Sequence, residues 1–118
     1  MRVTREAFEK LVAEAVESLP PEFKEKLENV EVLVRDEPPA DWRFADGSSP
    51  LGVYLGLPLT HRSAQDGFWP DRIWIYQHPI EGISANPSQM VENVRITVLH
   101  EIAHHFGISD ARLRELGY

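Results

Sequence analysis

The chain has 118 residues, no cysteine and a formal net charge of −7. This length predicts a single domain over residues 1–118. The absence of thiols excludes disulfides and leaves His, Asp and Glu as the metal ligands available to the protein. An acidic surface disfavours nucleic acids and anionic membranes, both of which attract Lys and Arg. We therefore expect neither as a partner.

The sequence also carries no targeting signal that we recognise. The first apolar residues alternate with acids, whereas a secretory signal has a continuous apolar run. No apolar stretch approaches the roughly 18 residues that a membrane-spanning helix needs. We expect a cytoplasmic protein, and the sequence predicts no particular oligomeric state.

The first third of the chain predicts packing elements. Thr4 can cap a helix, and apolar residues at positions 8, 11, 12, 15, 16 and 19 follow the spacing of one buried helical stripe. Pro20 ends this helix and Pro21 can begin a short second one. Valines alternate with other residues over residues 30–35, which predicts a strand.

The middle of the chain predicts two loops and two further strands. Residues 36–50 form a loop that we expect Trp42 and Phe44 to anchor. Residues 51–55 form a short strand, in which Gly52 marks a bulge or a close approach of other backbone. After a second loop, residues 72–76 are apolar on both faces and predict a strand that is covered on both sides. His78 and Pro79 break this strand.

The longest predicted helix covers residues 87–106. Asn86 fits its N-cap, Pro87 its first position, and Gln89 completes a pair that resembles a capping box. Ser109 can cap a last short helix over residues 110–116. An apolar stripe of the long helix can face the core: Val91, Val94, Val98, Ile102 and Phe106.

The end of the long helix carries the sequence HEIAHHFGISD at residues 100–110. Helical side chains four residues apart lie on one face, with Cβ atoms about 5–6 Å apart. His100 and His104 can therefore share one Zn²⁺ ion at about 2.0–2.1 Å from each ring nitrogen. Glu101 points beside the metal and can accept a proton from water that the metal activates.

Gly107 and Asp110 extend this motif beyond the helix. Gly107 can adopt the left-handed conformation that ends a helix, so the chain can turn back. Asp110 then follows at the place where a third ligand is needed, and three ligands with one open position are typical of a catalytic zinc site. The competing interpretation is a core helix with two exposed histidines, with Asp110 as an ordinary acid in the first turn of the last helix.

The motif H-E-x-x-H-x-x-G-x-x-D resembles that of the zincin metallopeptidases, and an Asp as third ligand is similar to the snapalysin type. The small size of the chain and two segments, residues 56–60 (GLPLT) and 71–81, resemble a narrower group. These are the small bacterial zinc proteases called minimal metallopeptidase-like zincins. The resemblance extends from the first helix to Tyr118.

From these elements we predict an α+β fold, a compact zincin-like domain. A short mixed sheet of about three strands packs against the helix at residues 87–106, and the N-terminal helix closes the core. The leading functional hypothesis is a zinc-dependent metallopeptidase that hydrolyses a peptide or protein substrate, with Glu101 as general base. An extended substrate could pair with the edge of the sheet.

Two other classes of function compete with peptide hydrolysis. One is a regulatory or interaction module that binds metal without turnover, because a fold does not establish an activity. The other is a metal-dependent endoribonuclease with H-x-x-x-H on a helix. Those enzymes lack the Glu after the first His, and the acidic charge of this chain disfavours RNA.

Several other side chains are candidates for stabilising an oxyanion, a role that zincins often give to a His, Tyr or Arg. The sequence does not choose among them, and packing or surface roles compete for each: Tyr54, His61, Tyr76 and His78. His105 is rotated by about 100° from His104, so we expect it at the surface or beside the metal site.

Overall fold

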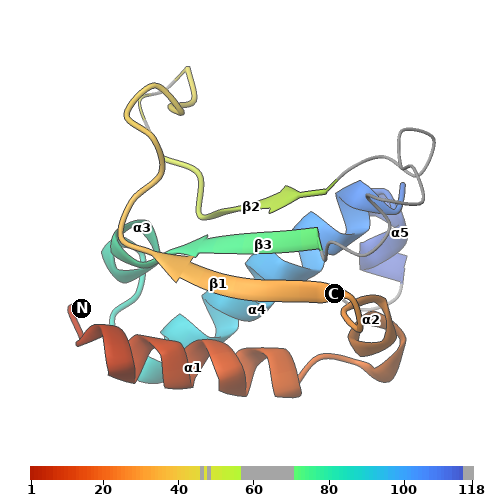
Figure 1. The fold of residues 1–118 in the computed structure, drawn as a ribbon, viewed down its shortest axis with the longest axis horizontal. Coiled ribbons are helices and arrows are strands. Elements are labelled where there is room, and N and C mark those ends of the chain that lie inside the picture. The colour runs from red at the N-terminus through yellow and green to blue at the C-terminus, as the bar shows by residue number, and fades with distance from the viewer. Residues whose placement is uncertain (46, 48, 57–70, 116–118) are drawn as a thin grey trace.

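The computed structural model describes residues 1–45, 47, 49–56 and 71–115, with only the backbone of Asp110. Two helices precede the strands of the described chain and three helices follow them, and Figure 1 shows the helices gathered against a small sheet. The elements are α1 (Arg5–Glu17), α2 (Pro21–Lys26), β1 (Val30–Arg35), β2 (Gly52–Leu55), β3 (Asp71–Tyr76), α3 (Gln77–Gly82), α4 (Pro87–His105) and α5 (Asp110–Glu115).

The sheet is three-stranded and mixed, in the order β1-β3-β2. β1 pairs with β3 in parallel, from Val30 opposite Asp71 to Arg35 opposite Tyr76. β2 pairs with β3 antiparallel, with Tyr54 opposite Ile73. The predicted α+β class, with a short mixed sheet on a long helix, is therefore confirmed.

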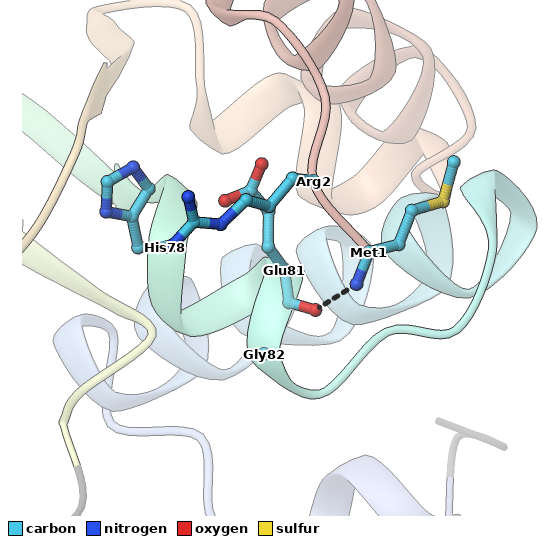
Figure 2. A pocket seen from close by; sticks show the side chains of 5 residues that line it. All are labelled: Met1, Arg2, His78, Glu81 and Gly82. Carbon is cyan, nitrogen blue, oxygen red and sulfur yellow. Dashed lines mark hydrogen bonds between the residues drawn. The ribbon is translucent and has the colours of Figure 1, made fainter.

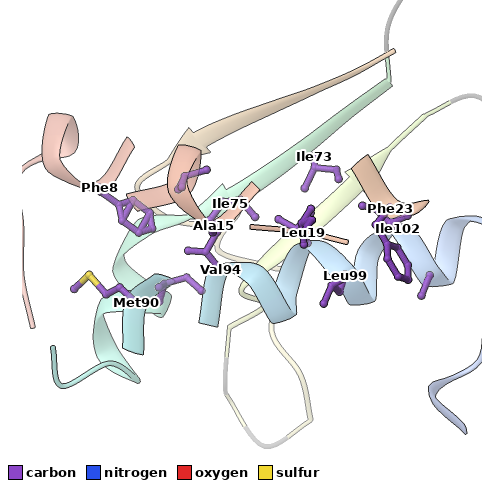
Figure 3. Close-up of a cluster of buried hydrophobic side chains, with 14 of the residues drawn as sticks. Phe8, Ala15, Leu19, Phe23, Ile73, Ile75, Met90, Val94, Leu99 and Ile102 are labelled. Atoms are coloured by element: carbon purple, nitrogen blue, oxygen red, sulfur yellow. The ribbon is translucent and has the colours of Figure 1, made fainter. Parts of the chain in front are cut away.

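One face of the sheet packs against α1 and α4. Ile73 and Ile75 of β3 are fully buried on this face, between Phe8 of α1 and Val94 and Val98 of α4. All of them belong to one apolar cluster, in which Figure 3 labels Phe8, Ile73, Ile75 and Val94. Burying an aliphatic or aromatic side chain of this size contributes about 1.5–3 kcal/mol. This cluster therefore fixes α4 under the sheet.

The second face of β3 is more open than the sequence predicted. Arg72 is exposed and Trp74 is half-buried. The Arg35 guanidinium lies 3.9 Å from the centroid of the Trp74 ring, a cation–π contact that covers part of it. On this side the expected cover is therefore found at Tyr76, which is 2% exposed, but not at Arg72, and Trp74 is covered only in part.

The α4 helix begins as predicted. The Asn86 side chain accepts a hydrogen bond of 2.9 Å from Gln89 N–H, and Pro87 occupies the first turn. Its inner stripe is buried as expected at Val94, Val98 and Ile102. Phe106 departs from that prediction because it is 46% exposed, just past the last helical residue.

Gly52 marks a close approach between β2 and α4. A Cβ at this position would lie 2.8 Å from Thr97 Cγ2 and 2.8 Å from the carbonyl oxygen of Trp74. Heavy atoms do not approach so closely, so only glycine lets β2 lie this near the helix. The predicted close approach is confirmed, although the first neighbour is a side chain of α4.

Two further predictions for connecting segments are wrong. Trp42 and Phe44 do not anchor the first loop, since they are 40% and 60% exposed. A short helix, α3, follows β3 where we expected only a break at Pro79. Proline is tolerated in the first turn of a helix, because the N–H that it lacks has no partner there. Among the described helices, none is both long and apolar enough to cross a membrane.

Candidate functional site

The last two turns of α4 carry the histidine pair, at the end of the sheet near α5 (Figure 1). His100 is half-buried and His104 is exposed. Their ring centroids are 6.2 Å apart, with 50° between the ring planes. Two rings that share a tetrahedral zinc ion through one nitrogen each have centroids about 5.2 Å apart, since each centroid lies about 3.2 Å from the metal. The observed separation is about 1 Å larger, so the side chains would have to rotate slightly to share one zinc ion.

The chain turns back directly after these histidines. Gly107 has φ +74°, the left-handed conformation that the sequence predicted. Its N–H donates to His104 O at 3.3 Å, and Ile108 N–H donates to Ala103 O at 2.7 Å. These two bonds form a Schellman motif, which ends α4.

The turn leads into α5, whose first residue is Asp110. Ser109 caps this helix, since its Oγ accepts a hydrogen bond of 3.1 Å from Arg112 N–H. The side chain of Asp110 lies outside the described part of the structure, so its role as third ligand stays a prediction. Among the side chains that are described, no group of three His, Asp or Glu could hold a metal.

Glu101 lies between the histidines and the edge of the sheet. Its side chain reaches β2, where Oε2 accepts a hydrogen bond of 3.1 Å from the backbone N–H of Tyr54. Tyr76 N–H bonds to Leu51 O, so residues 51, 53 and 55 direct their backbone groups toward β3. The groups of Gly52 and Tyr54 consequently point away from β3. Glu101 thus accepts a hydrogen bond from a backbone N–H of β2, an edge strand of the described sheet, that points away from β3.

The surroundings of Glu101 favour its protonated form. Burial raises the pKa of this carboxyl above its ordinary value of 4.5. The hydrogen bond from Tyr54 N–H and the charges of His104 and His100 act in the opposite direction, but they are smaller effects. A carboxylate with a raised pKa is a better proton acceptor near neutral pH, so this environment suits a general base.

A second cluster, formed by Tyr54, Asp71 and His105, lies directly beside Glu101. Tyr54 Oη donates a 2.7 Å hydrogen bond to Asp71 Oδ2. The Tyr54 ring stacks on His105, with centroids 3.9 Å apart and 16° between planes, and His105 Nε2 is 3.9 Å from the same Asp71 oxygen. Sequence reasoning did not single out Asp71, because its contacts depend on the strand pairing and no local pattern marks it.

The remaining oxyanion candidates lie in different places. Tyr76 is 2% exposed at the far end of β3. The pKa of Tyr76 is raised, mainly because the side chain is buried. The charge of Arg35 has a smaller, lowering effect on this pKa, and the charge of Glu101 has a still smaller, raising effect. His78 lies on α3, with Nδ1 3.4 Å from Glu37 Oε1, and it lines the pocket beside Met1 and Arg2 in Figure 2. His61 lies outside the described residues.

Comparisons with known proteins agree with the motif. The profile of a family described as zincin-like metallopeptidase matches residues 27–118, which contain the sheet and all the residues of the candidate site. A solved structure of a conserved hypothetical protein from Thermo thermophilus is similar, with a TM-score of 0.59 and 29% identity. The match covers 88% of this chain and 94% of that one. No curated protein matches the sequence at a significant level.

Proposed function

Because the chain belongs to the zincin-like metallopeptidase family, we propose that it is a zinc-dependent peptidase. His100, His104 and Asp110 would hold the metal, and Glu101 would serve as general base. The observation that carries this proposal is the position of Glu101. Its half-buried carboxylate follows the first histidine of the pair and is oriented by a hydrogen bond from the sheet edge.

The donor set supports zinc as the metal. Imidazole and carboxylate are common zinc ligands, and three protein ligands leave a fourth position open. When bound in such a site, zinc lowers the pKa of a water ligand to about 7 and polarises a carbonyl group. Within the described residues, His100 makes no hydrogen bond that would compete with such ligation.

Glu101 would move the proton during hydrolysis. Its Oε2 is held by Tyr54 N–H, and no described residue donates a hydrogen bond to Oε1. Oε1 can therefore accept a proton from the attacking water and pass it to the amine nitrogen that leaves. The raised pKa of Glu101 supports the first transfer, since a carboxyl that holds its proton more tightly is a stronger base.

The sheet edge suggests how a substrate would bind. β2 is an edge strand of the described sheet, and Gly52 directs its N–H and C=O outward, whereas the outward N–H of Tyr54 is bonded to Glu101. An extended peptide can pair with such an edge through backbone hydrogen bonds. We therefore propose an unstructured peptide or a flexible protein segment as the substrate class.

The test is hydrolysis of unstructured peptides by zinc-loaded protein, with Glu101→Gln beside the wild type. Loss of a general base typically lowers the rate by about 10²–10⁴-fold, and we expect this for Glu101→Gln. Glu92→Gln is the matched control, because Glu92 is also on α4 but is 56% exposed and pairs with Arg95. It should keep the wild-type rate.

Two results would contradict the proposal in different ways. If Glu101→Gln cleaves peptides as fast as the wild type, Glu101 is not the base. If neither protein cleaves any peptide while both bind zinc, the chain is a metal-binding module without turnover. Zinc titration of the same samples separates these results from simple loss of the metal.

A further inference from the structure

We infer that Asp71 is a positioning residue for Glu101 and acts through Tyr54. The carboxylate of Asp71 fixes the Tyr54 side chain, and the backbone N–H of Tyr54 holds the carboxylate of Glu101. The inference rests on the proposed function in one respect, that Glu101 is the proton acceptor. The contacts themselves are independent of that assignment.

The N–H that orients Glu101 lies near the end of a weak strand. β2 has only four residues, and Leu55 at its end is 44% exposed. Ends of short edge strands open locally at little cost in free energy. Since Tyr54 N–H points away from β3, its direction depends on how well this end of β2 is held. An anchor at this place would therefore keep the carboxylate of Glu101 in position.

Asp71 provides such an anchor at two points. Its side chain is 13% exposed at the start of β3, diagonally across from Tyr54 on the face that meets α4. One point is the hydrogen bond from Tyr54 Oη. The other is Gly56, directly after β2, where a Cβ would lie 2.6 Å from Asp71 Cγ. The carboxylate thus lies against the backbone that leaves β2.

His105 joins this anchor to the helix. Its imidazole stacks on the Tyr54 ring from the last residue of α4, four positions after Glu101. The cluster therefore connects β2 to α4, and the hydrogen bond between Tyr54 and Glu101 connects the same two elements. Any displacement of β2 from α4 would disturb both contacts together.

The same geometry argues against a direct role of the Tyr54 hydroxyl on the substrate. Its proton is already donated to Asp71 at 2.7 Å. A hydroxyl acting on an oxyanion would have to give up a hydrogen bond to a charged acceptor, and such bonds are about twice as strong as neutral ones. Tyr54 is accordingly better suited to positioning Glu101 than to binding the reacting carbonyl.

Amide hydrogen exchange of the zinc-loaded protein tests this inference. We would compare the amide of residue 54 with those of residues 53 and 55, which bond to β3, in wild type, Tyr54→Phe and Asp71→Ala. The amide of residue 54 should exchange about tenfold faster in both variants, the effect expected for loss of one hydrogen bond. The amide of residue 55, at the same end of β2, should also exchange faster. Residue 53, farther from this end, should keep its rate, whereas general destabilisation would change all three.

Two additional variants make the result specific. Asp71→Asn keeps an acceptor for the Tyr54 hydroxyl and should restore most of the protection. Asp36→Ala removes a carboxylate that pairs with Arg5 at the end of β1, and it should leave the amide of residue 54 unchanged. Peptide hydrolysis should show a kcat about tenfold lower for Tyr54→Phe with KM within about twofold, because only the chemical step loses an oriented base.

The outcomes separate this inference from the proposed function. Wild-type exchange at residue 54 in both Tyr54→Phe and Asp71→Ala would overturn the inference. So would faster exchange with an unchanged kcat, because the contact would then not position the base. If the wild type hydrolyses no peptide, the proposed function fails, and the exchange rates still decide whether Asp71 holds the contact between β2 and Glu101.

Discussion

On α3, at one end of the sheet, Glu81 is 5% exposed and one oxygen of its carboxylate accepts two hydrogen bonds. Oε2 accepts hydrogen bonds from Val3 N–H at 2.9 Å and from Gln77 Nε2 at 3.2 Å. Gln77 in turn donates to Val3 O and accepts from Arg5 Nε. Figure 2 shows Glu81 at this end, close to the N-terminal segment.

At the other end, beside α5, the polar groups are arranged differently. Glu101 is only half-buried and accepts one hydrogen bond among the described residues, from Tyr54 N–H. His100 is half-buried and His104 is exposed. At the α3 end, hydrogen bonds join the Glu81 carboxylate to Gln77 and to the N-terminal segment. At the α5 end, the side chains of His100 and Glu101 keep atoms that make no hydrogen bond to a described residue. Such a difference is expected between a structural carboxylate and one proposed to act as a general base.

Glu81→Ala should have the largest effect on stability. It removes the acceptor of two part-buried or buried donors, and leaving such groups unpaired costs about 1–3 kcal/mol each. We expect urea denaturation to show a loss of about 3 kcal/mol in the free energy of unfolding, with unchanged zinc affinity. Glu92→Ala is the control and should change stability by no more than about 0.5 kcal/mol. Equal losses of stability in Glu81→Ala and Glu92→Ala would show that the hydrogen bonds of Glu81 are not a structural anchor at the α3 end of the sheet.

Gly52→Ala should have an intermediate effect, because its Cβ would meet Thr97 Cγ2 and Trp74 O at 2.8 Å. Overpacking of this kind costs about 1–3 kcal/mol. The displaced β2 should also expose the amide of residue 54 to faster hydrogen exchange. Gly82→Ala is the matched control, since its Cβ would have nothing within 4 Å. A stable Gly52→Ala with normal exchange would show that β2 and α4 are not tightly coupled.

The smallest effect concerns the pH dependence of metal-free protein. Burial raises the pKa of Glu101, so the folded state binds its proton more tightly than the unfolded state. Stability is then lost as pH rises through the range above the ordinary value of 4.5. Glu101→Gln lacks this titration, so it should gain stability relative to the wild type as pH rises from about 4 to about 7. If the melting temperatures of wild type and Glu101→Gln differ by the same amount throughout this pH range, burial does not raise the pKa of Glu101.

The sequence predicted the features that depend on local patterns. The start of α4 follows from Asn86 and Pro87, and its end follows from Gly107, because caps need particular residues at particular places. The fold class followed from the order and periodicity of the elements. The chemistry proposed for His100, Glu101 and His104 also came from spacing alone.

The features that were missed depend on contacts between distant residues. Asp71 meets Tyr54, 17 positions away in the sequence, only because β2 pairs with β3 in one register. The α3 helix was missed because Pro79 was taken as a break, although proline is compatible with a first helical turn. Phe106 was placed in the core by the stripe of α4, but the helix ends just before it and the chain turns at Gly107.

Calorimetric titration with zinc tests most directly whether the α4 end of the sheet is a metal site. We expect saturable binding by the wild type, with His104→Ala losing most of the affinity. His78→Ala is the matched control, because its imidazole lies on α3 beside Glu37, and it should bind zinc as the wild type does. Absence of zinc binding by the wild type, or equal loss in His78→Ala and His104→Ala, would contradict the account.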